Sequence, residues 1–108
     1  MNKKPDILQG TLDLLVLKIL AHGPSHGYAI AQKILVTSRQ TLDVQQGSLY
    51  PALHRLEKKG LIASEWNESE SGRMAKVYAL TKSGRKQLAD ELAEWTRYSS
   101  AINWVLEA

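Results

Sequence analysis

Cysteine is absent from the 108-residue sequence. The chain therefore cannot form a disulfide, a thiolate nucleophile or a cysteine-ligated zinc site. Apolar runs are short, and the one from Leu14 to Leu17 is followed at once by Lys18, whereas a membrane-spanning helix needs roughly 20 apolar residues. The first ten residues contain two lysines but no apolar segment of the kind found in secretion signals. We expect a cytoplasmic protein without a membrane span.

A strong excess of charge of either sign is also lacking. The formal net charge is +3 and the sequence pI is about 9.3, which permits a polyanionic partner without requiring one. The content of 44% hydrophobic and 23% charged residues is ordinary for a globular protein. A chain of this length forms one domain with one core.

Two helices are expected in the first forty residues. Apolar residues at helical spacing predict the first over Leu8 to Ala21, and Gly23 with Pro24 would end it. Ser25 is a predicted N-cap for the second helix. The predicted inner face of that helix consists of Tyr28, Ala31, Ile34 and Leu35.

The segment QGSLYPALHRLEKKGLI, residues 46–62, predicts a third helix with a proline near its start. Proline has no N–H to donate, so Pro51 is expected in the first turn, with Ser48 as the N-cap. These assignments give a helix over about residues 49–59 that Gly60 ends.

The apolar period changes to two in LIASEW, residues 61–66, and again in KVYAL, residues 76–80. The polar, glycine-containing segment between them predicts a β-hairpin. Thr81 is then expected to cap a long helix over about residues 82–106. The predicted fold is mainly α with a small β-hairpin. It consists of a winged helix-turn-helix DNA-binding domain over residues 1–81 and one long C-terminal dimerisation helix over residues 82–108, in one compact unit.

The third helix is predicted to have one apolar and one polar face. Leucines and alanine form the apolar face, while Tyr50, Pro51, His54 and Lys58 share the outer face, flanked by Arg55. Such groups can reach phosphates and base edges, and the helix start at Ser48 offers free N–H groups to a phosphate. Taken alone, the segment also fits a solvated helix end with cations near its dipole. The hairpin that follows favours DNA binding.

The hairpin carries charges of both signs. Arg73 and Lys76 suit a contact with the DNA backbone or minor groove. Glu65, Glu68 and Glu70 would be repelled by phosphates and are expected to face away. A cluster of cations at Lys82, Arg85 and Lys86 fits either a phosphate contact or a solvated face.

The last helix carries a seam with alternating spacings of four and three residues. The seam consists of Leu88, Leu92, Trp95, Ser99, Ile102 and Leu106. This spacing keeps the residues on one side of the helix, as in a heptad repeat, and predicts a two-fold homodimer in which the helix also meets the first helix. The alternative is that the seam packs only on its own domain.

Metal binding and catalysis are not expected. His22 and His26 are four residues apart, but Gly23 and Pro24 interrupt the helix on which they would share a face. Ser48 and His54 lie on different sides of a helix, with no acidic residue to orient the histidine. We therefore predict no catalytic residues, no metal site and no cofactor.

The chain closely resembles the PadR family of transcriptional regulators, especially its short, acidobacterial-type branch. The resemblance covers nearly the whole chain and rests on LQGTLDLLVLKIL, HGYAIAQKI, QGSLYPALHRLEKKGLI and GRMAKVYALTKSGRKQL. It implies a homodimeric repressor of an inverted-repeat operator, often with ATGT and ACAT half-sites, that a small molecule releases. It places Ser48, Tyr50, His54 and Lys58 on DNA and makes Tyr28 a phosphate contact.

Some members of this family bind flat aromatic compounds at the dimer interface. Trp95 and Trp104 are accordingly candidates for a ligand pocket between subunits, although tryptophans at helical spacing also serve simply in packing. The acidic hairpin keeps a second function open, that of a winged-helix protein-interaction module that does not bind DNA.

Overall fold

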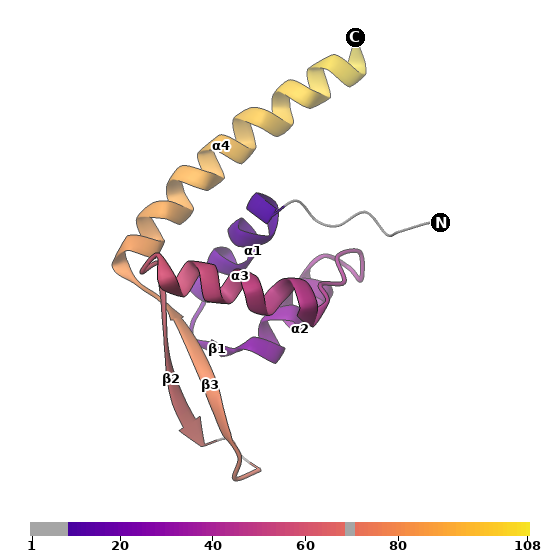
Figure 1. Ribbon diagram of the computed structural model, residues 1–108. Coiled ribbons are helices and arrows are strands. Elements are labelled where there is room, and N and C mark those ends of the chain that lie inside the picture. The colour runs from indigo at the N-terminus through magenta and orange to yellow at the C-terminus, as the bar shows by residue number, and fades with distance from the viewer. Residues whose placement is uncertain (1–8, 69–70) are drawn as a thin grey trace.

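Three helices precede a hairpin, and one long helix follows it, in the computed structural model (Figure 1). The structure describes residues 9–68 and 71–108. The elements are α1 (Gln9–Ala21), β1 (Ser25–His26), α2 (Gly27–Thr37), α3 (Gln46–Lys58), β2 (Ile62–Glu68), β3 (Met74–Leu80) and α4 (Lys82–Glu107). The predicted fold class, mainly α with a small antiparallel hairpin and a long C-terminal helix, is confirmed. The predicted helical residue Leu8 lies outside the described residues.

A short strand that the sequence did not predict completes the sheet. Ser25 and His26 pair antiparallel with Tyr78 and Val77, which gives the strand order β1-β3-β2. The predicted role of Ser25 as an N-cap is therefore wrong, because His26 occupies that position and makes no side-chain cap bond. The hydroxyl of buried Ser25 instead lies 3.2 Å from Nζ of Lys33. This pairing covers part of the open edge of β3.

The core lies between the three short helices and the base of the sheet. Its fully buried large side chains come from α1, α2, α3 and β2: Val16, Leu17, Leu20, Ile30, Leu49, Leu53, Leu56 and Ile62. On α2, Ile30 and Ile34 are buried, whereas Tyr28 is 63% exposed. The prediction that Tyr28 belongs to the inner face is therefore wrong, since the buried side of α2 is centred on the two isoleucines.

The start of α3 also differs from the prediction. Gln45 is the N-cap, and the N–H groups of Ser48 and Leu49 already donate to its carbonyl oxygen. Ser48 is therefore inside the helix, and Pro51 is its sixth residue and not part of the first turn. Pro51 removes only the backbone hydrogen bond to the carbonyl oxygen of Gly47. Gly47 is exposed, so water can hydrogen-bond to this carbonyl instead. Gly60 ends the helix as predicted, with a φ of 76°.

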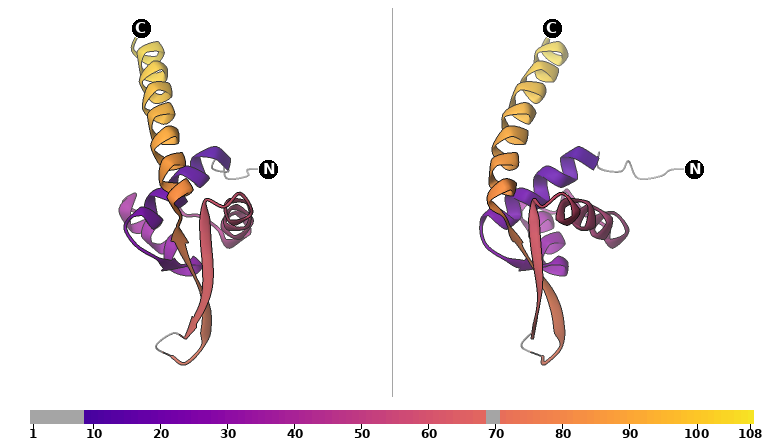
Figure 2. Two further views of the ribbon diagram at one scale, coloured as in Figure 1. Left: turned by 90° about the vertical axis from the view of Figure 1, so that its left-hand side faces the viewer. Right: turned by 60° about the vertical axis from the view of Figure 1, so that its left-hand side comes forward.

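Thr81 caps α4 as predicted, since its side chain accepts the N–H of Gly84. In Figures 1 and 2, α4 and the hairpin extend in opposite directions from the helical body. The first half of α4 packs beside α1, and Leu88 contacts the core. The hairpin and α3 therefore lie toward one end of the molecule, and the free part of α4 forms the other end.

Candidate nucleic-acid interface

One face of α3 is buried and the other is exposed, as predicted. Leu49, Ala52, Leu53 and Leu56 are at most 1% exposed. On the other side, Tyr50, Pro51, His54 and Lys58 are all exposed, and we call these four residues the recognition surface. This surface combines an aromatic hydroxyl, an imidazole and an ammonium group, which can all donate hydrogen bonds to phosphates or base edges.

Tyr28 lies beside the start of α3. Together with Gln45, Gln46 and Gly47 it lines a surface groove of about 400 Å³ between α2 and α3. Ser48 is exposed in the first turn of α3. Tyr28 and the first turn of α3 therefore border the same groove, where a phosphate could meet both.

Arg55 extends toward α1. Its Nη2 lies 3.1 Å from Oδ1 of Asp13, a largely buried residue of α1. This ion pair joins α3 to α1 and compensates the buried carboxylate. The side chain that was predicted to flank the recognition surface thus pairs with α1 and is partly buried.

Glu57 connects α3 with the hairpin. Its Oε2 accepts a hydrogen bond of 2.6 Å from the hydroxyl of Ser64, and its Oε1 lies 3.9 Å from Nζ of Lys76. Nζ of Lys76 also lies 5.9 Å from the ring centre of Trp66 and 6.0 Å from that of Tyr78. A cation over two aromatic faces is stabilised by their quadrupoles. The side chain of Lys76 therefore contacts both the hairpin aromatics and Glu57 of α3.

Tyr78 lies at the centre of this contact between the sheet and α3. Burial raises the pKa of its phenol above the ordinary value of 10.0, and the nearby Glu57 and Tyr50 raise it further. The phenol is therefore neutral at physiological pH, and the charge at this contact comes from Glu57 and Lys76.

The outer part of the hairpin is exposed. Arg73 is exposed beside Gly72, which has a φ of 84°. Glu65 and Glu68 are exposed as well, while Glu70 lies outside the described residues. The large exposed side chain of Trp66 was not identified as a site residue from the sequence. Its register opposite Lys76, which follows from the hairpin, was the signal that could have identified it.

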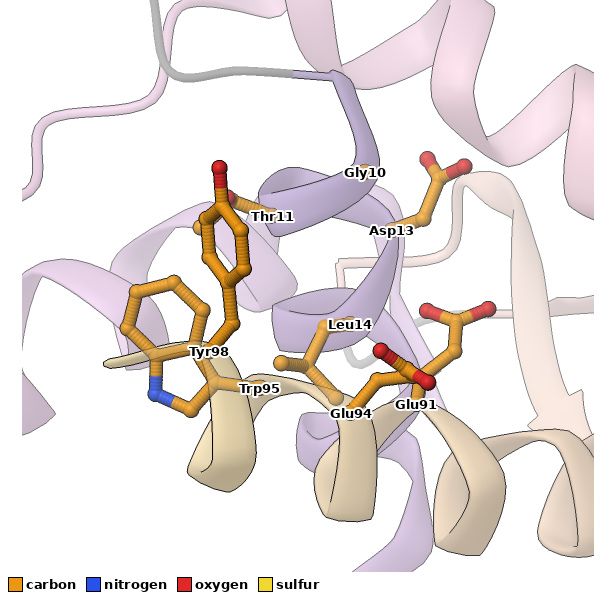
Figure 3. Close-up of a pocket in the computed structure, with 8 residues that line it drawn as sticks. All are labelled: Gly10, Thr11, Asp13, Leu14, Glu91, Glu94, Trp95 and Tyr98. Atoms are coloured by element: carbon orange, nitrogen blue, oxygen red, sulfur yellow. The ribbon is translucent and has the colours of Figure 1, made fainter. Parts of the chain in front are cut away.

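A second hollow lies between the start of α1 and the middle of α4 (Figure 3). It has a volume of about 420 Å³, and its lining residues are Gly10, Thr11, Asp13, Leu14, Glu91, Glu94, Trp95 and Tyr98. In Figure 3 the rings of Trp95 and Tyr98 project from α4 toward the first turns of α1. Tyr98 was missed from the sequence, although its place three residues after Trp95 puts both rings near the same face.

The seam of α4 is largely uncovered in the single chain. Leu88 is half-buried, but Leu92, Trp95, Ile102 and Leu106 are all exposed, Leu106 to 74%. Trp104 is 69% exposed and does not line the hollow beside Trp95. Within one chain, the two tryptophans are therefore not brought together, and a pocket that uses both requires a second subunit.

The remaining candidates do not form a site. His22 is exposed after α1, whereas His26 belongs to β1. Among residues 9–68 and 71–108, no three His, Asp or Glu side chains are grouped as a metal ion would require. No helix in the same ranges is long and apolar enough to cross a membrane. Lys82, Arg85 and Lys86 are exposed on the first turns of α4.

A model of the transcriptional regulator PadR-like family matches residues 16–90. The chain belongs to this family. Over 78 residues it is 38% identical to transcriptional regulator Rv3488 of Mycobacterium tuberculosis. The aligned region covers 72% of this chain and 69% of that protein.

Solved structures of PadR-type and other regulators share the fold. A transcriptional regulator from Clostridium thermocellum is 30% identical with a TM-score of 0.83, and the match covers 92% of this chain and 96% of that one. A PadR family regulator from Clostridium difficile is 35% identical with a TM-score of 0.74, covering 88% and 97%. Family and fold are those of DNA-binding transcriptional regulators and not of enzymes.

Proposed function

We propose that this PadR-family protein is a homodimeric repressor that reads an inverted-repeat operator with α3 as its recognition helix. The observation that carries this proposal is the exposed, polar and aromatic recognition surface of α3, held beside a hairpin by Glu57. In a winged helix-turn-helix such a helix enters the major groove. Because the proposed partner is genomic DNA, we also propose a cytoplasmic location for the protein.

Individual roles follow from chemistry and position. His54 and Tyr50 are placed to hydrogen-bond base edges, and Lys58 to pair with a phosphate. Tyr28 and Ser48 would contact phosphates beside the start of α3, where they are exposed. On the hairpin, Arg73 would follow the backbone or the minor groove. Lys76, which lies close to Glu57 of α3, could add a further phosphate contact. Arg55 would instead stabilise the fold through its ion pair with Asp13.

The exposed seam of α4 supports the homodimer. α4 has 26 residues, and its last seven residues are all exposed. That part of its apolar surface therefore has no packing partner within the described chain. A second copy related by a two-fold axis would bury the seams of both helices and the nearby surface of α1. Residues 1–81 would then form the DNA-binding part and residues 82–108 the dimerisation helix.

The hollow beside Trp95 supports release by a small aromatic effector. Its walls combine two aromatic rings with Leu14, and it lies next to the seam that the partner would cover. Such rings suit a flat aromatic ligand. Titration of planar aromatics should quench Trp fluorescence in the parent protein and much less in Trp95→Leu. No saturable change across a varied panel would exclude this part of the proposal.

The exposed glutamates of the hairpin favour one alternative, a protein-interaction module without DNA. The deciding experiment is binding to duplex DNA from the protein's own upstream region and to a scrambled duplex, at several salt concentrations. A repressor should bind the native duplex more tightly, with one dimer per site and a strong salt dependence. Equally weak binding of both duplexes would favour the alternative.

Matched variants separate the contributions of individual side chains. Lys58→Ala should weaken binding to all sequences and lower the salt slope by about one unit, whereas His54→Ala should mainly relax sequence preference. Arg97→Ala is the control, since it removes one cation from α4, far along the chain from the recognition surface. An adaptor protein would show none of these effects.

A further inference from the structure

The first turn of α4 lies directly against the segment that ends α3. Gly84 is the third residue of α4 and is buried. A Cβ atom on Gly84 would overlap the carbonyl oxygen of Leu61, and it would lie 3.0 Å from the carbonyl carbon of Leu61 and 2.6 Å from Cδ1 of Leu80. The most severe clash is with the backbone carbonyl of Leu61, which cannot change rotamer as a side chain can. Only glycine therefore allows the two segments to approach this closely.

Thr81 holds the same contact by hydrogen bonds. Its N–H donates to the carbonyl oxygen of Leu61 at 3.1 Å. Its hydroxyl lies 2.7 Å from the carbonyl oxygen of Gly60 and 2.9 Å from that of Leu61, and donates to this pair. The hydroxyl oxygen also accepts the N–H of Gly84 at 3.0 Å. One threonine thus caps α4 and binds it to the preceding turn.

The two carbonyl groups belong to the termination of α3. The N–H of Leu61 donates to the carbonyl of Leu56 at 3.0 Å, and the N–H of Gly60 donates to that of Glu57 at 2.9 Å. With Gly60 in the left-handed region, this pattern is a Schellman motif, which fixes both residues relative to the last turn of the helix. The recognition helix and α4 are therefore joined by a continuous set of backbone contacts.

We propose that Gly84 and Thr81 are positioning residues that set the direction of α4 relative to the recognition helix, and thereby the separation of the two recognition helices. This inference rests on the proposed homodimer. α4 has 26 residues and is therefore about 39 Å long, so a change of about 10° in its direction moves its far end by about 7 Å. Half-sites one helical turn apart are about 34 Å from centre to centre, so such a shift would misplace one recognition helix.

The absence of cysteine makes a direct distance measurement possible. A single spin label can be attached to Lys59→Cys, an exposed position at the end of α3. Pulsed dipolar resonance on the full-length dimer then reports the distance between the two labels, before and after adding Gly84→Ala. We expect Gly84→Ala to shift or broaden this distance by several ångströms. An unchanged distance in a folded dimer would overturn the inference.

Variants of Thr81 give an independent test if Gly84→Ala does not fold. Thr81→Val removes the hydroxyl that binds both α4 and the end of α3, and should change the label distance. Thr81→Ser keeps the hydroxyl and should give the label distance of the parent protein. Ser83→Ala, at an exposed position in the same turn, should also leave the label distance unchanged. A parent-like distance in Thr81→Val would also overturn the inference. Absence of any dipolar coupling in the labelled parent protein would instead refute the homodimer.

Discussion

The ring of Tyr50 lies against Gly27 at the start of α2. A Cβ atom on Gly27 would lie 3.0 Å from both Cε1 and the hydroxyl oxygen of Tyr50, and 3.2 Å from Cζ. Gly27 is buried, whereas Tyr50 remains 42% exposed. The glycine thus leaves room for one side of the tyrosine ring while its other side faces outward from the recognition surface.

Gly27→Ala should therefore displace Tyr50. We expect a several-fold loss of affinity for operator DNA and a loss of about 1 kcal/mol in the free energy of unfolding, as for a slightly overpacked site. In a Tyr50→Ala background the added methyl group meets no ring, so the same substitution should have little further effect on either quantity. Equal effects of Gly27→Ala in the two backgrounds would show that the ring contact is not responsible.

The ion pair between Arg55 and Asp13 should contribute to stability. Arg55→Ala leaves a largely buried carboxylate without its partner, and urea denaturation at fixed protein concentration should show a loss of about 1–3 kcal/mol. Arg97→Ala breaks the exposed pair with Glu94 and is the matched control, with an expected loss of less than about 1 kcal/mol. The salt slope of DNA binding should be unchanged in Arg55→Ala. A slope lower by about one unit would instead indicate a direct phosphate contact.

The raised pKa of Tyr78 predicts a loss of stability in alkaline solution. Burial favours the neutral phenol in the folded state, so this contribution is fully present below the unfolded pKa of 10.0 and is lost as the pH rises through the higher folded pKa. The free energy of unfolding should therefore fall more steeply above pH 10 in the parent protein than in Tyr78→Phe. Parallel pH profiles for the two proteins would contradict this assignment.

The seam of α4 predicts a homodimer that a single substitution in the seam should dissociate. Leu92→Asp places a charge in the proposed interface, and light scattering should show the mass falling to that of a single 12.1 kDa chain. Ala93→Asp adds the same charge at the next residue, an exposed position off the seam, and should leave the dimer intact. A dimer mass in Leu92→Asp would remove the seam from the interface.

The periodic features of the fold were predictable because they are local. The buried face of α3, the two paired strands of the hairpin and the cap at Thr81 each depend on residues a few positions apart, and the structure confirms them. The prediction of Ser48 as the N-cap of α3 was wrong because it required Pro51 to lie in the first turn. A proline whose missing bond faces water can lie beyond the first turn.

Other features depend on contacts between distant parts of the chain. β1 has only two residues, too few to show an alternation of apolar and polar side chains. Its partner strand is about fifty residues away in the sequence. Arg55 lies at the border of the polar face of α3, and its hydrogen bond to Asp13, 42 residues earlier, directs it toward α1. At the start of a helix, Gly84 looks only mildly unfavourable, since the backbone that it must accommodate is brought there by the fold.

The pairing of β1 with β3 gives the hairpin a three-stranded base and a two-stranded outer part. At Val77 and Tyr78 the sheet has three strands, whereas from Trp66 and Lys76 outward it is a two-stranded ribbon, an arrangement of marginal stability by itself. Backbone amides at the base should therefore exchange with solvent more slowly than those near Glu68 and Met74. In the proposed DNA complex, such a gradient would let the outer ribbon adjust to the local width of a groove while the base keeps its position beside α3.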